Sequence, residues 1–203
     1  KAFAAGADIA EFATERADSA QAKAYGALIH DAMRAVAQCR HPTLAMIEGA
    51  CVGGGLEIAA MCDLRICGES SRFGIPVNRL GLVMAYGELQ GLLALVGRAV
   101  ALEILLEGRV FDAREALAKG LVTRVVADDR VEQEAMASAQ RIAEGAPLVA
   151  RWHKKFIARL GAQADIPAHE WDEGFACFDT ADYRIRSEEH TSELQSRGLI
   201  SYA

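Results

Sequence analysis

The first part of the chain alternates between strand-like and helix-like patterns of apolar residues. Residues 19–39 carry apolar side chains three or four positions apart, which predicts a long amphipathic helix that ends before His41-Pro42. Residues 44–47 form a short apolar run and residues 63–67 alternate, so both predict strands. Residues 121–126 predict the last strand. Strands therefore alternate with helices as far as residue 126.

Helical patterns dominate the remainder of the chain. The apolar segment at residues 89–106 predicts a helix that is interrupted at Gly97, and Asp112 is placed to cap a short helix that stops at Gly120. After the last strand we expect only helices, over residues 128–144, 148–160 and 170–183. This order predicts an α/β core followed by a helical C-terminal part.

Three consecutive glycines, residues 53–55, lie between an apolar strand and an apolar helix that carries one carboxylate, Glu57. Glycines at such a junction let a backbone N–H point outward, and the helix N-terminus adds positive potential. We interpret this turn as an oxyanion-binding site with an acid/base group beside it. The alternative is that Glu57 only complements the helix N-terminus.

The chain opens inside a predicted strand that turns at Gly6. Asp8 follows where a helix cap belongs, with Glu11 three residues later. The first residue is Lys1 and not methionine, so we expect a fragment that lacks an N-terminal segment.

Composition narrows the classes of partner. The 203 residues are 52% hydrophobic and 25% charged, with a net charge of −6 and a pI near 5.4, which argues against a nucleic-acid partner. Short apolar runs predict no membrane segment, and we expect a cytoplasmic protein. The five cysteines form no C-x-x-C pair and read as reduced, mostly buried thiols. The five histidines lack metal-binding spacing, so we expect no metal.

Four motifs in order resemble the enoyl-CoA hydratase/isomerase (crotonase) family: residues 1–9, residues 49–57, Cys62-Asp63 and residues 73–76. The resemblance extends to about Tyr183. It implies a crotonase-like spiral of ββα units over residues 1–126, a C-terminal helical region over residues 127–185, and a homotrimer or dimer of trimers. It also implies an acyl-CoA thioester as substrate, so that coenzyme A arrives with the substrate and no cofactor is bound permanently.

The same resemblance assigns the site residues. The backbone N–H groups of Ala7 and Gly54 would hold the thioester oxygen, and Glu57 would be an acid/base group. Ala5, Ala7, Asp8, Ile9, Ala10 and Gly54 would line the CoA-binding side. Ala10 stands where some members carry a lysine, so one contact to the cofactor phosphates would be absent.

Val77 departs from the family pattern, because hydratases of the family carry a second glutamate there and a valine cannot move a proton. Glu88 or Tyr86 could supply the missing group, or Glu88 could be a solvated glutamate of the first helical turn. We therefore expect an enolate-stabilising enzyme, most simply an enoyl-CoA hydratase. The alternatives are an isomerase, a decarboxylase or hydrolase on the same scaffold, and a catalytically silent acyl-CoA-binding or assembly subunit.

The last residues match nothing that the rest of the chain requires. Residues 186–196 resemble the conceptual translation of a sequencing-adapter oligonucleotide, so we expect residues 186–203 to be non-native. The alternative is a solvated polar tail. Resequencing the source gene with a different library chemistry decides between the two.

Overall fold

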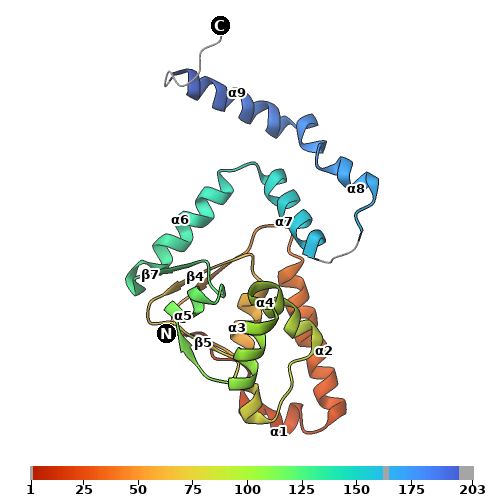
Figure 1. The fold of residues 1–203 in the computed structure, drawn as a ribbon, viewed down its shortest axis with the longest axis vertical. Coiled ribbons are helices and arrows are strands. Elements are labelled where there is room, and N and C mark those ends of the chain that lie inside the picture. The colour runs from red at the N-terminus through yellow and green to blue at the C-terminus, as the bar shows by residue number, and fades with distance from the viewer. Residues whose placement is uncertain (1, 162–164, 197–203) are drawn as a thin grey trace. The chain divides into compact units, whose positions relative to one another are not determined.

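The computed structural model describes residues 2–161 and 165–196, which divide into two compact units between residues 139 and 140 (Figure 1). The first unit contains all the strands of the described chain and the second is helical. The α/β fold class is thus confirmed. The domain limits at residues 126 and 185 stay predictions. In chain order the first unit contains β1 (Ala2–Ala4), η1 (Ile9–Glu11), α1 (Phe12–Glu15), α2 (Ser19–Ala37), β2 (Leu44–Ile47), β3 (Ala50–Val52), α3 (Gly54–Met61), β4 (Leu64–Gly68), β5 (Arg72–Gly74), η2 (Pro76–Leu80), α4 (Tyr86–Glu107), β6 (Phe111–Asp112), α5 (Ala113–Ala118), β7 (Arg124–Val126) and η3 (Asp128–Arg130).

Two small sheets organise the first unit. One has the strand order β1-β3-β5-β6 and the other β2-β4-β7, and every pairing is parallel except that of β5 with β6. The predicted strands at residues 44–47 and 63–67 are confirmed, and the last strand is shorter than predicted. The sequence pattern missed β3, β5 and β6, because strands of two or three residues are too short to show a period.

The core lies where the helices cover these strands. Helices α2, α3 and α4 pack against one another, and α3 also packs against β1 and β3. Figure 1 shows α2, α3 and α4 grouped together beside the strands. The buried apolar side chains include Ile47, Leu56, Phe73, Ile75, Leu92, Ile104 and Leu121. Because α3 is the most enclosed of these helices, its N-terminus is held firmly beside the strand ends.

Helix α4 is long and apolar enough, by length and composition, to cross a membrane. The predicted interruption is present, since Gly97 has the non-helical angles φ 69° and ψ 175° and divides the helix. Leu92, Ala101 and Ile104 of this helix are buried in the core of the first unit. A single helix of this kind is weak evidence for a membrane span, because helices that pack in the core of a soluble protein pass the same test of length and composition.

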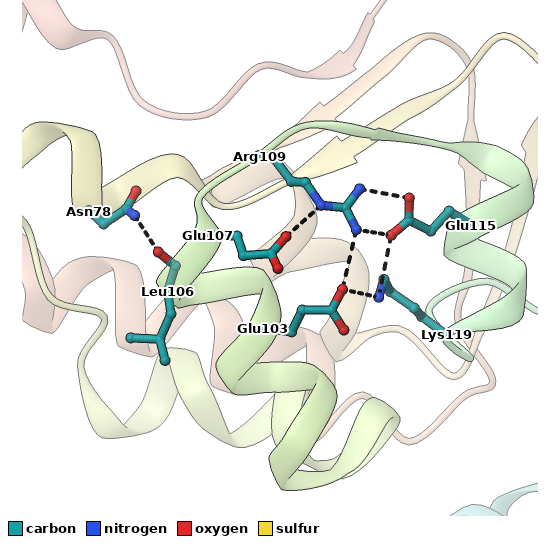
Figure 2. Close-up of polar contacts among 7 residues, drawn as sticks. All are labelled: Asn78, Glu103, Leu106, Glu107, Arg109, Glu115 and Lys119. Carbon is teal, nitrogen blue, oxygen red and sulfur yellow. Dashed lines mark hydrogen bonds and ion pairs between the residues drawn. The ribbon is translucent and has the colours of Figure 1, made fainter.

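A cluster of charges joins the C-terminal end of α4 to α5 (Figure 2). Arg109 donates from Nε to Oε2 of Glu107 at 2.7 Å and from Nη1 to Oε2 of Glu115 at 2.7 Å. Its Nη2 also contacts Glu103, at 3.2 Å, and Glu115. Lys119 reaches the Glu103 carboxylate at 2.6 Å. Arg109 therefore links carboxylates from both helices.

The second unit consists of the end of α6 (Val131–Ala143), α7 (Pro147–Gly161), α8 (Ala168–Glu173), η4 (Ala176–Asp179) and α9 (Ala181–Ser196). The single helix predicted over residues 170–183 is wrong. Helix α8 ends at Glu173, Phe175 lies in the turn before η4, and Thr180 is extended, so α8, η4 and the start of α9 replace the single helix. Residues 186–196 continue α9, and residues 197–203 lie outside the described chain, so the origin of this tail stays a prediction.

Candidate active site

The two turns of the candidate site follow neighbouring parallel strands. Strand β1 pairs with β3 in the register Ala2 with Ala50 and Ala4 with Cys51. Ala7 comes shortly after the end of β1, and Gly54 comes shortly after the end of β3. Because the carboxyl ends of parallel strands meet at one edge, segments that lie far apart in the sequence are brought together there.

The glycine run serves this junction in two different ways. Gly53 is the N-cap of α3 and has a φ of 55°, which side chains rarely tolerate. Its N–H donates to the carbonyl of Gly74 on β5 at 2.8 Å. A methyl group on Gly55 would lie 2.3 Å from the carbonyl oxygen of Ala4, so α3 can approach β1 only because this side chain is missing.

Gly54 leaves open a space that three site groups surround. A methyl group built on Gly54 would lie 3.9 Å from the amide nitrogen of Ala7 and 3.9 Å from Oε2 of Glu57. One small volume is thus within reach of the Ala7 amide, the N-terminus of α3 and a carboxylate. That arrangement suits an oxygen that gains negative charge while a proton moves beside it.

Glu57 is buried in α3 and only 8% exposed. Burial first, and then the charge of Glu88, raise the pKa of Glu57 from 4.5 to about 7, against the charge of Arg16, which lowers it. A carboxyl group with a pKa near neutral exchanges protons readily at physiological pH. The environment of Glu57 is therefore that of an acid/base group.

Glu88, Tyr86 and Val77 are the positions at which the sequence suggested, or lacked, a second acid/base group beside Glu57. Glu88 is half-buried in the first turn of α4, where its Oε2 accepts a hydrogen bond from the Ala85 amide at 2.7 Å. Its charge acts on Glu57, yet this carboxylate oxygen is engaged in capping the helix. Tyr86 is 93% exposed. Val77 packs partly buried against the core in η2, so it offers the site no proton.

The residues expected on the CoA-binding side are accessible. Ala5, Ala7, Asp8, Ile9 and Ala10 are all exposed. Asp8 caps η1, because its Oδ1 accepts a hydrogen bond from the Ala10 amide at 2.9 Å. The cap is therefore present, with Ala10 as the donor in place of the Glu11 amide that a capping box uses.

Two arginines that act on α3 were not predicted from the sequence. Arg16 lies 3.7 Å from the ring centre of Tyr25 and 4.5 Å from that of Phe12, and its charge reaches Glu57. Arg65 is buried and donates to the carbonyls of Leu121, at 2.7 Å, and Cys62, at 2.5 Å. It thereby holds the C-terminal end of α3. Neither arginine belongs to a recognisable sequence motif, so the sequence alone gave no signal for either of them.

Cys51, Cys67 and Asp63 could also take part in chemistry, but their surroundings give them a role in the fold. Burial raises the pKa of Cys51 to about 12 and that of Cys67 to about 11, so both stay thiols. Oδ2 of Asp63 accepts hydrogen bonds from the amide and hydroxyl of Thr43, at 2.7 and 2.9 Å. Within residues 2–161 and 165–196, no group of three or more His, Cys, Asp or Glu could hold a metal ion.

Comparison with known proteins decides the family. The family model described as Enoyl-CoA hydratase/isomerase matches residues 1–176. The chain belongs to the enoyl-CoA hydratase/isomerase family. The resemblance inferred from the four sequence motifs is therefore confirmed.

Relatives of this enoyl-CoA hydratase/isomerase family member agree in sequence and in fold. A Rhizobium meliloti protein named "Probable enoyl-CoA hydratase" is 41% identical over 160 residues, which are 78% of this chain and 60% of that protein. The crystal structure of an enoyl-CoA hydratase/carnithine racemase from Magnetospirillum magneticum is 50% identical with a TM-score of 0.93. The matched region covers 95% of this chain and 72% of the Magnetospirillum chain. The crotonase-like fold is thereby confirmed, and the chain spans about 60% of the length of the Rhizobium relative.

Proposed function

We propose that the protein binds an acyl-CoA thioester and stabilises its enolate, acting as an enoyl-CoA hydratase. The observation that carries this proposal is the open volume at Gly54, which the Ala7 amide and the Glu57 carboxylate both border. The amides of Ala7 and Gly54 would hold the thioester oxygen, and Glu57 would orient water and accept its proton. Relatives named enoyl-CoA hydratase support this choice of reaction.

The valine at position 77 favours a second candidate function, that of an enoyl-CoA isomerase. Moving a double bond needs a single base that takes a proton from one carbon and returns it to another, and Glu57 alone could do this. Incubating the protein with a short 2-enoyl-CoA and with a 3-enoyl-CoA, followed by mass spectrometry and chromatography, separates the two. Gain of one water supports the hydratase, and a shifted double bond without a mass change supports the isomerase. Binding without any product would contradict both.

Substituting Val77 tests whether this position limits hydration. Val77→Glu places a carboxylate where hydratases of the family carry their second glutamate, so we expect the rate of water addition to rise by at least tenfold. The measurement is the rate of loss of 2-enoyl-CoA absorbance. Val77→Gln, which has nearly the same shape but cannot move a proton, is the matched control. Equal rates in both variants would show that Val77 does not limit the reaction.

Removing the Gly54 amide tests the oxyanion hole. Proline is compatible with the first position of a helix, and Gly54 occupies that position in α3, so Gly54→Pro should fold. It deletes the N–H, and losing one such donor costs about 3–4 kcal/mol of transition-state stabilisation. We expect kcat to fall by about 10²–10³-fold with an unchanged circular dichroism spectrum. Full activity would refute the role of this amide.

We propose further that the protein assembles as a homotrimer or a dimer of trimers in the cytoplasm. Large apolar side chains on the surface of the first unit, among them Ile9, Leu28 and Val83, support an assembly that would cover them. Light scattering coupled to size-exclusion chromatography gives the number of chains. A monomer at all concentrations would contradict the proposed assembly.

A further inference from the structure

The loop of residues 108–110, which connects α4 to β6, packs against the end of β5. A methyl group on Gly74 of β5 would lie 2.6 Å from the carbonyl oxygen of Arg109, so this oxygen approaches β5 only because residue 74 has no side chain. Beside the loop, Asn78 of η2 donates from Nδ2 to the carbonyl of Leu106 at 2.9 Å, as Figure 2 shows. The end of α4 and its loop are therefore in contact with both β5 and η2.

Gly74 also holds the glycine turn of the candidate site. Its carbonyl accepts the hydrogen bond from the Gly53 amide at 2.8 Å, at the point where β3 and β5 pair. Gly53 is the N-cap of α3 and directly precedes Gly54, the residue at the open volume that the Glu57 carboxylate borders. The series of contacts that starts at Arg109 and passes through Gly74 therefore ends at Gly54.

The side chain of Arg109 fixes where this loop lies. Its guanidinium contacts Glu103 and Glu107 of α4 and Glu115 of α5 (Figure 2). The backbone of the same residue meets Gly74, so the loop is held by ionic contacts on one side and by close packing on the other. Without the guanidinium, three carboxylates would be left close to one another, and their repulsion would loosen the loop.

We propose that Arg109 is a positioning residue for the oxyanion hole, which it holds in place through Gly74 and Gly53. This inference rests on the proposed enolate chemistry at Gly54. An amide stabilises a developing negative charge only while its N–H stays aimed at the oxygen, and a displacement of about 1 Å can cost about 10²-fold in rate. Because Arg109 acts through backbone contacts behind the glycine turn, its effect falls on the chemical step and not on substrate binding.

Two substitutions of Arg109 test this role. Arg109→Met keeps much of the length of the side chain and removes its charge, so we expect kcat for enoyl-CoA conversion to fall by about 10–10²-fold while KM changes little. Arg109→Lys keeps a charge but lacks the planar fork that contacts three carboxylates, so its kcat should lie between those of the wild type and Arg109→Met. An unchanged kcat in Arg109→Met would overturn the proposal.

Lys119→Met is the matched control for loss of stability. Lys119 contacts Glu103 at 2.6 Å and Glu115 at 3.3 Å, so it belongs to the same cluster of charges, but it lies at the end of α5 and not in the loop. Its substitution should lower the melting temperature while kcat stays that of the wild type. An equal fall of kcat in Lys119→Met and Arg109→Met would show that the cluster only stabilises the fold, and it would overturn the positioning role.

The amide of Gly53 gives a readout that does not depend on turnover. The sequence contains two Val-Gly pairs, Val52-Gly53 and Val96-Gly97, so ¹³C in valine carbonyls and ¹⁵N in glycine select these two amides by NMR. Val96→Ile removes the second signal and thereby assigns the first. We expect the Gly53 amide to lose protection from deuterium exchange in Arg109→Met, because its acceptor on β5 is no longer held in place.

The two readouts separate this inference from the proposed function. The Gly53 amide should stay protected in Lys119→Met, which loses contacts of the same cluster. If the wild type converts an enoyl-CoA and Gly53 is equally protected in Arg109→Met, the role of Arg109 is overturned and the proposed function stands. If the wild type converts none, the proposed function falls, and the effect of Arg109 on catalysis falls with it, whatever the exchange rates.

Discussion

Glu57 combines two features that are seldom found in one carboxyl group of a small helix. It is almost fully buried, and it lies next to an open volume bounded by the Ala7 amide. Burial and the charge of Glu88 raise its pKa to about 7, and the charge of Arg16 opposes them only in part. The residue is therefore able to be neutral in the empty site and negative during turnover.

The raised pKa of Glu57 predicts how stability depends on pH. A carboxyl group whose pKa is higher in the folded state binds its proton more tightly there, so its contribution is complete below 4.5 and is lost as pH rises through about 7. The difference between these two values corresponds to about 3 kcal/mol. Glu57→Gln should lack this decrease. Urea unfolding followed by circular dichroism, at pH values below and above the window, measures it.

Activity should depend on pH in the opposite direction if Glu57 acts as the base. The carboxylate form increases as pH rises through about 7, so kcat/KM should rise where the stability falls. For the stability prediction, free energies of unfolding that change with pH in the same way in the wild type and in Glu57→Gln would contradict the raised pKa of Glu57.

At the scale of elements, Arg109 connects α4 and α5, which the chain joins through a short loop and strand β6. Its contacts to Glu103, Glu107 and Glu115, shown in Figure 2, raise the pKa of its guanidinium above the usual value. The side chain is 41% exposed, so salt screens these contacts. The network is therefore a connection between α4 and α5 whose strength depends on ionic conditions.

We expect Arg109→Met to lower the melting temperature at low salt and to lower it less at high salt, because screening weakens the contacts in the wild type. Thermal unfolding by circular dichroism at two salt concentrations measures both effects. Arg34→Met is the matched control, since Arg34 forms a single exposed pair with Asp31 within α2. An equal loss at both salt concentrations would assign the effect to packing of the side chain.

At the scale of the whole molecule, the two units differ in how well they are packed. The first contains the core of buried side chains. In the second, α7 (Pro147–Gly161), α8 (Ala168–Glu173) and η4 (Ala176–Asp179) contain no fully buried residue, and Ile157, Trp171 and Phe175 are more than half exposed. A unit with little buried apolar surface has little free energy of unfolding.

The two tryptophans of the chain, Trp152 and Trp171, both belong to the second unit, so their fluorescence reports on that unit alone. We expect the fluorescence transition to occur at lower urea concentration than the main transition seen by circular dichroism. Trp171→Phe, which leaves Trp152 as the reporter, should give the same early transition. Coincident transitions would show that the chain unfolds as one cooperative unit.

Much of the element order could be predicted from local patterns, and the errors have physical causes. The helix of α2 and the strands β2 and β4 are long enough to show a period, and Asp112 caps α5 as predicted. Strand β3 was missed because three residues show no period. The helix predicted over residues 170–183 fails because its aromatic spacing does not reveal the extended backbone at Thr180.

The sequence by itself determined the family, the glycine turn and the presence of one carboxylate beside it, because these depend on residues close together along the chain. Only the tertiary structure decided that Ala7 and Glu57 border the same volume at Gly54, and that Arg109 meets Gly74. Such approaches depend on strand pairing and helix packing between segments that are far apart in sequence. The raised pKa of Glu57 has the same origin, since burial belongs to the assembled core and to no single segment.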